Sequence, residues 1–144
     1  VENGVAKELV YDFKNAKKEG KKSTGHGGFG GWGPMPTNLF MAGGLSSLGD
    51  MIKGTRRGVL VTRFHYTNLA HPMKMLITGM TRDGTFLIED GEIVKPIKNM
   101  RFTESALRVF GSMDMVSQDL VRTGRAVVPA IRVPAFSFTG TTEF

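Results

Sequence analysis

Alternating apolar and polar positions dominate the middle of the chain. Residues 59–66 (VLVTRFHY) are rich in β-branched and aromatic side chains, and we expect residues 73–80 (MKMLITGM) to pair with them. Such segments are typical of strands. Two Asp-Gly dipeptides follow, at 83–84 and 90–91, and the runs after them (residues 86–88 and 93–94) are apolar. Because Asp-Gly favours tight hairpin turns, this part of the chain predicts an antiparallel meander with a turn at each dipeptide.

Three short segments carry helix signals. They are 12–20, with Asp12 as cap and Gly20 as stop; 46–55, with Ser46 or Ser47 as cap and Gly54 as stop; and 105–113, introduced by Thr103-Glu104-Ser105. Each begins with a side chain that can accept a hydrogen bond from a free backbone N–H. In the third segment, Leu107 and Phe110 fall on one face. The pattern therefore predicts three helices of about two turns.

The remaining apolar runs predict further strands, at 5–11, 37–41, 113–121, 127–133 and 136–139. Pro129 and Pro134 favour an edge or a bulge for the last two, because proline cannot donate to a ladder. The expected fold class is α+β: mostly antiparallel β-sheet with about three short helices, with barrel-like closure as an open alternative.

The length of 144 residues suits one domain, spanning 1–144. The chain begins at Val1 in mid-pattern, so we expect a fragment with a further region upstream. No apolar run approaches the ~20 residues that cross a bilayer, which predicts no membrane association. The chain has no cysteine, which excludes disulfides, cysteine catalysis and thiolate ligands within it. Both features favour a cytoplasmic location.

The net charge is +6, and part of it lies in one lysine run. That run comprises Lys14, Lys17, Lys18, Lys21 and Lys22. We interpret it as a solvated helix face rather than a nucleic-acid patch, because aromatic residues do not interleave it.

The glycine-rich stretch 23–36 (STGHGGFGGWGPMP) contains GHGGFG, which fits G-x-G-x-x-G. Dinucleotide binding needs a strand before this motif and a helix after it. Here a basic helical segment precedes it and two prolines follow, so the motif does not predict a nucleotide site. The three histidines, His26, His65 and His71, lack metal-ligand spacing and are interpreted as surface or hydrogen-bonded side chains. From its residues alone, the chain holds no complete catalytic constellation.

Several segments, taken in order, resemble the C-terminal domain of the TldD/PmbA family. They are STGHG, PTNLFMAGG, RRGVLVTRFHYTNLAHP, ITGMTRDGTFLIEDGEIVKPIKNMRFTES and VVPAIRVPAFSFTG. The most specific part is the Arg-Asp-Gly turn, the apolar strand, I-E-x-G-E-I and a following proline strand. Members of this family were named modulators of DNA gyrase and are viewed as peptidases and peptide-maturation factors.

The resemblance implies a domain of a zinc metallopeptidase complex. Catalytic members carry an H-E-x-x-x-H helix upstream and a third zinc ligand, a cysteine, near the end of the C-terminal domain. At that place this chain reads residues 122–127 (RTGRAV). We therefore expect the non-catalytic partner type, inactive alone and without a cofactor of its own. A zinc site completed by another residue, or no zinc at all, are alternatives, and zinc remains possible in the full-length protein or its partner subunit.

The resemblance also implies pairing with a TldD/PmbA-like subunit, as a homo- or heterodimer, and an extended peptide held in a cleft. Strand edges such as VVPAIRV would bind the peptide backbone. The cleft candidates in this chain are His26, Phe29, Trp32 and His65. A DNA- or partner-binding scaffold is the alternative function, although nucleic acid is not the favoured partner. A small-ligand barrel ranks last.

Overall fold

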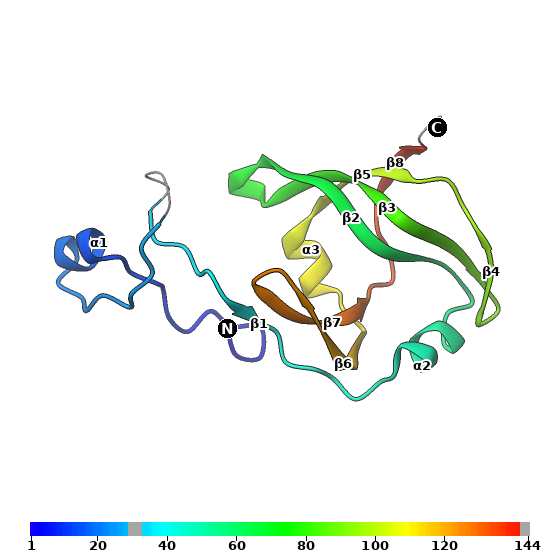
Figure 1. The fold of residues 1–144 in the computed structure, drawn as a ribbon, viewed down its shortest axis with the longest axis horizontal. Coiled ribbons are helices and arrows are strands. Elements are labelled where there is room, and N and C mark those ends of the chain that lie inside the picture. The colour runs from blue at the N-terminus through cyan, green and yellow to red at the C-terminus, as the bar shows by residue number, and fades with distance from the viewer. Residues whose placement is uncertain (29–32, 142–144) are drawn as a thin grey trace. The chain divides into compact units, whose positions relative to one another are not determined.

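The computed structural model describes residues 1–28 and 33–141. They form two compact units, Val1–Ala42 with Val121–Val128, and Gly43–Leu120 with Pro129–Phe144. No helix among the described residues has the length and apolar character needed to cross a membrane. Figure 1 shows the elements of both units.

The first unit is built around one short helix and one short strand. Helix α1 (Phe13–Lys18) begins at the predicted cap, where the Asp12 side chain accepts a hydrogen bond from the backbone N–H of Asn15. Strand β1 (Leu39–Phe40) pairs in parallel with the start of β7 (Ala126–Arg132). The predicted strand at 5–11 is wrong, since the only bridge that these residues form is the isolated one from Val5 to Glu2. No other described strand pairs with them, and a strand needs a partner for its backbone groups.

The second unit contains a five-stranded sheet. Its strands are β2 (Arg57–His71), β3 (Leu76–Glu89), β4 (Glu92–Pro96), β5 (Met100–Ser105) and β8 (Phe138–Thr141). The order is β2-β3-β5-β8, and β4 also pairs with β3, all antiparallel. A short 3-10 helix, η1 (Pro72–Lys74), connects β2 to β3. Within the described residues the sheet does not close into a barrel, because β2 has a strand partner on one side only.

The two Asp-Gly dipeptides have different structures. Asp90-Gly91 forms the predicted turn, with φ of 47° and 85°, as a two-residue hairpin loop of type I′ requires. The turn predicted at Asp83-Gly84 is wrong. There β3 continues, and the two residues stand opposite the single residue Thr62 as a bulge. The Thr62 hydroxyl donates to the Gly84 carbonyl at 2.9 Å, which satisfies a group that the ladder leaves free.

The other two helices lie in the second unit. Helix α2 (Leu48–Lys53) starts with a capping box, in which Ser47 and Asp50 each bond the other's backbone N–H. Helix α3 (Ala106–Gly111) starts at Ser105, as predicted, but the strand β5 that leads into it was missed. The predicted apolar face of α3 exists, yet Leu107 and Phe110 remain exposed in this chain.

A three-stranded sheet has the order β1-β7-β6, with β6 (Met115–Thr123) and β7 forming a hairpin. Residues 127–133 were predicted to lie at an edge or a bulge, and β7 has β1 beside it only at Ala126 and Val127, so its later residues form an edge on that side within the described chain. Its pairing with β1 ends at Val127, so Pro129 lies beyond the last residue that β1 could bond. Gly44 approaches β6 closely: a Cβ there would lie 2.3 Å from the Val116 carbonyl oxygen, so only glycine fits.

Candidate functional site

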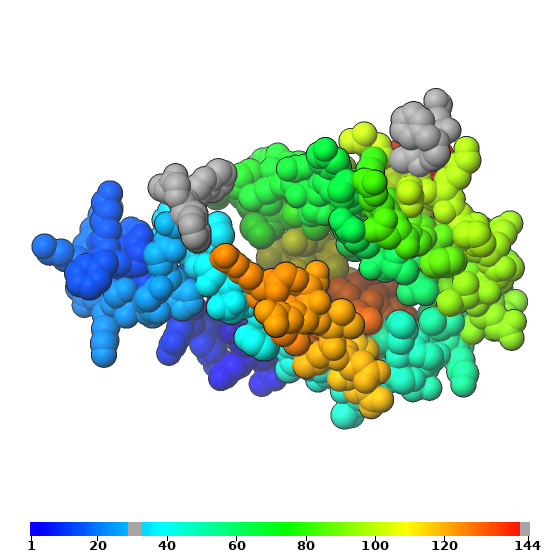
Figure 2. All heavy atoms as spheres, in the orientation of Figure 1, coloured from blue at the N-terminus to red at the C-terminus, as the bar shows by residue number. Residues whose placement is uncertain are grey.

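The five-stranded sheet has two chemically different faces. Directly opposed residues of antiparallel strands share a face, and successive residues alternate. The register therefore places one set of mostly polar side chains together, which we call the polar face: Arg63, His65, Asn68, Thr78, Met80, Arg82 and Arg101. The opposite side, the packed face, carries Phe64, Thr81, Phe102 and Glu104. Figure 2 shows side chains of β2 and β3, in green, at the surface of the second unit.

The packed face holds the core of this unit. Phe102 is 1% exposed, and its ring lies 4.8 Å from that of Phe64 and 5.4 Å from that of Phe136. Gly79 stands opposite Phe102, and a Cβ there would lie 2.8 Å from the ring. Aromatic pairs at these distances add to the free energy gained by burial. This face positions the strands, and every buried side-chain nitrogen or oxygen atom among the described residues has a hydrogen-bond partner.

Glu104 is the buried carboxylate of the packed face. Arg108 of α3 binds both of its oxygens, and the backbone N–H groups of Ser105 and Ser137 also donate to it, at 2.7 and 2.9 Å. Burial alone would raise the pKa of Glu104, but these hydrogen bonds outweigh it and hold the pKa at about 2. Glu104 is therefore a structural anion that joins β5, α3 and the segment before β8, rather than a proton donor or acceptor near neutral pH.

The polar face carries a chain of charged groups at the Asp83 bulge. Arg63 and Arg82 stand directly opposite each other, and Asp83 lies beside both, at 2.7 Å and 3.8 Å. Arg82 also lies 2.8 Å from the Nε2 atom of His65. Since a guanidinium only donates, Nε2 of His65 is the acceptor in this contact. The bulge thus brings a carboxylate between two arginines that would otherwise repel each other.

A second bulge, in β2, forms a pocket on the polar face. His65 opposes Met80 and Asn68 opposes Thr78, so Tyr66 and Thr67 share one partner. Tyr66 has a φ of 50°, and its carbonyl accepts a hydrogen bond from the Asn68 side chain at 2.9 Å. The pocket has a volume of about 270 Å³. Its lining residues are Tyr66, Asn68, Thr78, Gly79, Met80 and Arg101.

The outer edge of β2 borders this pocket. Throughout its fifteen residues, the described chain provides a strand partner on the β3 side alone. Several large apolar side chains near this edge are exposed, among them Tyr66 at 75% and Leu69 at 50%. A long edge with exposed apolar groups is the kind of surface that another chain covers.

The cleft candidates predicted from sequence lie in different parts of the chain. His26 is in the first unit, where its Nδ1 atom lies 2.8 Å from the Thr24 hydroxyl. His65 is on the polar face of the second unit. Phe29 and Trp32 lie outside the described residues. A substrate role for these residues stays a prediction. Tyr66 and Arg101 were missed, because only the register and the bulge bring them together.

The described residues do not fit a zinc site. No three of their His, Cys, Asp or Glu side chains gather as metal ligands would. Residues 122–127, where the family resemblance places a cysteine, comprise the end of β6, the turn at 124–125 and the start of β7, and they carry no sulfur, imidazole or carboxylate group. We therefore derive no step through a metal held by this chain.

Known proteins place the chain in a family. Residues 1–140 match the family described as the PmbA/TldA metallopeptidase C-terminal domain. A metalloprotease TldD homologue of Buchnera aphidicola subsp. Acyrthosiphon pisum is 35% identical over 124 residues, which cover 83% of this chain and 25% of that protein. A second TldD homologue, of Buchnera aphidicola subsp. Schizaphis graminum, is 31% identical over 124 residues, which again cover 83% of this chain and 25% of that protein. The chain thus spans about a quarter of the length of these relatives.

Solved structures share the fold. A proposed modulator of a DNA gyrase from Thermotoga maritima has a TM-score of 0.83 at 25% identity, over 96% of this chain and 32% of that one. TldE from Thermococcus kodakarensis has a TM-score of 0.82 at 24% identity, over 97% and 33%. Together with the family match, these similarities confirm the resemblance found in the sequence. The chain belongs to the TldD/PmbA metallopeptidase family and is its C-terminal domain.

Proposed function

We propose that this domain binds an extended peptide and a partner subunit in a zinc metallopeptidase complex that processes peptides, and that it is of the non-catalytic partner type. The observation that carries the proposal is the outer edge of β2 in a chain of this family. An extended peptide can pair with such an edge through backbone hydrogen bonds, with few demands on its side chains. The same exposed surfaces suit a partner subunit.

The partner-type assignment rests on the ligands that the chain lacks. It has no cysteine, and its described His, Asp and Glu side chains do not cluster. The His65 ring bonds Arg82, and the Glu104 carboxylate is held by Arg108 and two backbone N–H groups. These pairings occupy groups that would otherwise be candidates for a metal or for acid-base chemistry.

Backbone pairing is tested with N-methylated peptides and the full-length protein. The parent is an uncharged peptide of about ten residues, blocked at both ends, with a fluorescent label. Two analogues carry N-methyl groups at alternate positions, one at the even and one at the odd residues. A strand at an edge donates every second N–H to its neighbour, so one analogue is expected to bind at least ~10-fold more weakly while the other binds as the parent does. Equal binding of all three would refute pairing at a strand edge.

The partner type is tested by activity and metal content. The full-length protein alone is expected to leave the peptide intact and to contain no stoichiometric zinc by mass spectrometry. Addition of a TldD-type subunit should produce a complex by size exclusion and cleavage of the peptide. Zinc at one ion per chain in the protein alone, together with cleavage, would make it a catalytic subunit instead.

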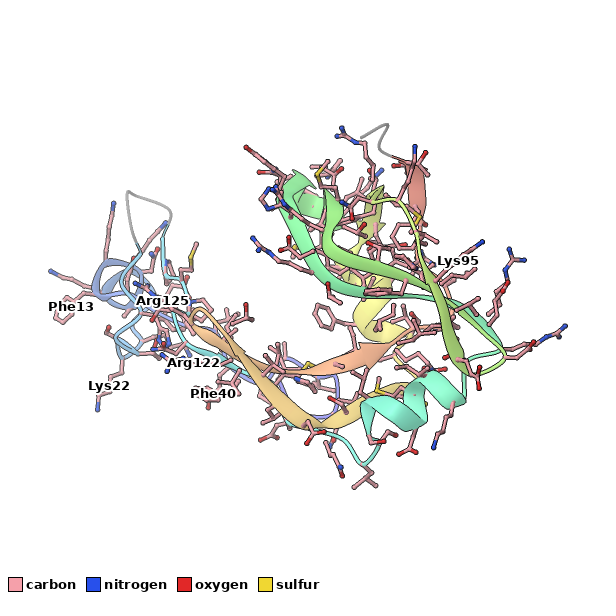
Figure 3. The ribbon with its side chains drawn as sticks, turned by 45° about the vertical axis from the view of Figure 1, so that its right-hand side comes forward. Phe13, Lys22, Phe40, Lys95, Arg122 and Arg125 are labelled. Atoms are coloured by element: carbon pink, nitrogen blue, oxygen red, sulfur yellow. The ribbon has the colours of Figure 1, made fainter. Side chains whose placement is uncertain are left out.

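A DNA- or partner-binding scaffold is the second candidate, because charge gathers in the first unit. That unit holds eight basic and four acidic residues, giving +4 of the total +6. Figure 3 shows Lys22, Arg122 and Arg125 there, with the exposed rings of Phe13 and Phe40. Binding to duplex DNA that weakens steeply with salt would support this candidate. No binding at low salt would exclude it.

A further inference from the structure

The pocket on the polar face holds a single charged side chain. Of its six lining residues, Arg101 alone is ionised at neutral pH. No hydrogen bond or ion pair joins its guanidinium to any other described side chain, and the residue is exposed. The other two arginines of this face differ, since Arg63 bonds Asp83 and Arg82 lies beside both Asp83 and His65. Among the described residues nothing occupies the Arg101 guanidinium, so it can donate to a ligand in the pocket.

The other walls of the pocket add hydrogen-bonding groups. Tyr66 supplies a phenol and Asn68 an amide with a second N–H, whereas the Thr78 hydroxyl already donates to the Phe102 carbonyl. Gly79 contributes backbone alone to the pocket, since a Cβ on it would point toward the Phe102 ring of the packed face. The residues that line the pocket therefore provide one cation and several neutral polar groups, and none of them carries a carboxylate. This is the environment that an anionic group with two oxygens matches, because a guanidinium binds such a group with two parallel hydrogen bonds.

The backbone at this place is held in a conformation that aromatic residues rarely adopt. Tyr66 has a φ of 50°, in the left-handed region, which is an outlier for a bulky side chain. The Asn68 amide fixes the bend by donating to the Tyr66 carbonyl. The Tyr66 ring stands edge-on to the His65 ring, with centroids 4.7 Å apart. Backbone strain of this kind gathers at binding sites, where the surrounding structure maintains it.

We infer that this pocket binds a carboxylate of the peptide substrate, either its C-terminal group or an acidic side chain. The inference rests on the proposed function, because the peptide is the partner that would lie along the adjacent edge of β2. In the bound state the Arg101 guanidinium donates two hydrogen bonds to the carboxylate. Tyr66 covers one side of the group, and Asn68 keeps Tyr66 in place.

The inference is tested with the full-length protein and three peptides that share one sequence of uncharged residues and differ only in whether and where they carry a carboxylate. The first is blocked at both ends, the second has a free C-terminal carboxylate, and the third is blocked but has one internal Gln replaced by Glu. Dissociation constants are measured by fluorescence anisotropy for the wild type, Arg101→Gln, Arg101→Lys and Arg57→Gln. Arg57 is an exposed arginine at the far end of β2 and does not line the pocket, so it is the matched control.

The carboxylate is expected to tighten binding by the wild type about tenfold over the blocked peptide. This gain in affinity should disappear in Arg101→Gln and persist in Arg57→Gln. It should shrink in Arg101→Lys, because lysine keeps the positive charge but lacks the two parallel N–H donors of the guanidinium. Gain from the second peptide identifies a C-terminal group, and gain from the third an acidic side chain. An equal gain in Arg101→Gln, or no gain in the wild type, overturns the inference while leaving peptide binding intact. Failure of all three peptides to bind overturns the proposed function as well.

Arg101→Gln should not affect folding, since the side chain is exposed and makes no hydrogen bond or ion pair with another described side chain. Its melting temperature should match that of the wild type within about 1 °C. The blocked peptide should bind this variant as it binds the wild type. Loss of binding to the blocked peptide by Arg101→Gln would mean that the residue supports the strand edge in general, and would also overturn the inference.

Discussion

The two faces of the five-stranded sheet use similar residues for different purposes. On the packed face, the carboxylate of Glu104 is 3% exposed and is bonded by Arg108 and two backbone N–H groups. On the polar face, the carboxylate of Asp83 is half exposed and lies between two arginines that are equally exposed. An ion pair in water contributes little to stability, whereas a buried one must be fully bonded or it destabilises. The comparison assigns stability to the packed face, and the polar face is the one on which we propose that a ligand binds.

The largest difference in stability between the two faces should come from substitutions of large apolar side chains. Phe102→Ala removes a ring that is 1% exposed and in contact with two other rings, so the free energy of unfolding should fall by about 4 kcal/mol. Met80→Ala, one strand away on the polar face, should cost about 1 kcal/mol because Met80 is only half-buried. Urea denaturation measures both. Equal losses would mean that the polar face is packed as well.

Acid should weaken the packed face first. The pKa of Glu104 in the folded chain is about 2, below its ordinary value of 4.5, so its contribution is complete above pH 4.5 and is lost as the pH falls toward 2. The shift corresponds to about 3 kcal/mol. Urea denaturation between pH 5 and pH 2 should show this loss in the wild type.

Glu104→Gln should remove most of that slope, because glutamine does not titrate. It should also lower stability at pH 7, since Arg108 loses its charged partner. A residual slope is expected from Asp50 and Asp114, whose pKa values are also lowered, by bonds from Ser47 and Arg132. An unchanged slope in Glu104→Gln would show that these two carboxylates, and not Glu104, determine the acid sensitivity.

Two threonine hydroxyls, one on each face of the sheet, allow a matched comparison of hydrogen bonds. Thr81, fully buried, accepts a hydrogen bond from the Met100 backbone N–H at 2.9 Å and another from Thr85 at 2.7 Å. Thr81→Val leaves that N–H without its partner, which should cost about 2 kcal/mol. Thr78→Val loses a donor to the Phe102 carbonyl near the polar face and should cost about 0.5 kcal/mol. Thermal unfolding distinguishes the two, and a reversed order would contradict the assignment of the faces.

Sequence patterns predicted local features that depend on neighbouring residues. The caps at Asp12, Ser47 and Ser105 were all expected, because capping needs only a few consecutive residues. The two Asp-Gly dipeptides show the limit. Both dipeptides allow positive φ, but the strand opposite decides whether the chain reverses or bulges. Strand β2 pairs with β3 on both sides of Asp83, whereas this pairing ends at Glu89, just before Asp90. That information lies in residues about twenty positions away.

The candidate site was predicted only in part for the same reason. The role of His65 stays a prediction, and the residue was named because histidine is a rare and conspicuous residue type. Tyr66 and Arg101 were not, because they are thirty-five positions apart and meet only through the register of three strands and one bulge. Strand β5 itself was missed, since its alternation (MRFTES) is short and ends in a helix cap. Without β5, no pattern could place Arg101 beside β3.

The smallest expected effect concerns the ion pair on the polar face. Asp83→Asn keeps the left-handed backbone that Asn tolerates well, but it leaves Arg63 and Arg82 opposed without the carboxylate between them. The cost should be about 0.5 kcal/mol at low salt. Its dependence on salt is more informative than its size. Salt screens the attraction to Asp83 in the wild type, whereas in Asp83→Asn it screens repulsion between two arginines. Raising NaCl should therefore narrow the difference in melting temperature between the two proteins. A cost above about 1.5 kcal/mol that salt does not reduce would mean that Asp83 is as deeply engaged as Glu104, and that the two faces differ less than their exposure indicates.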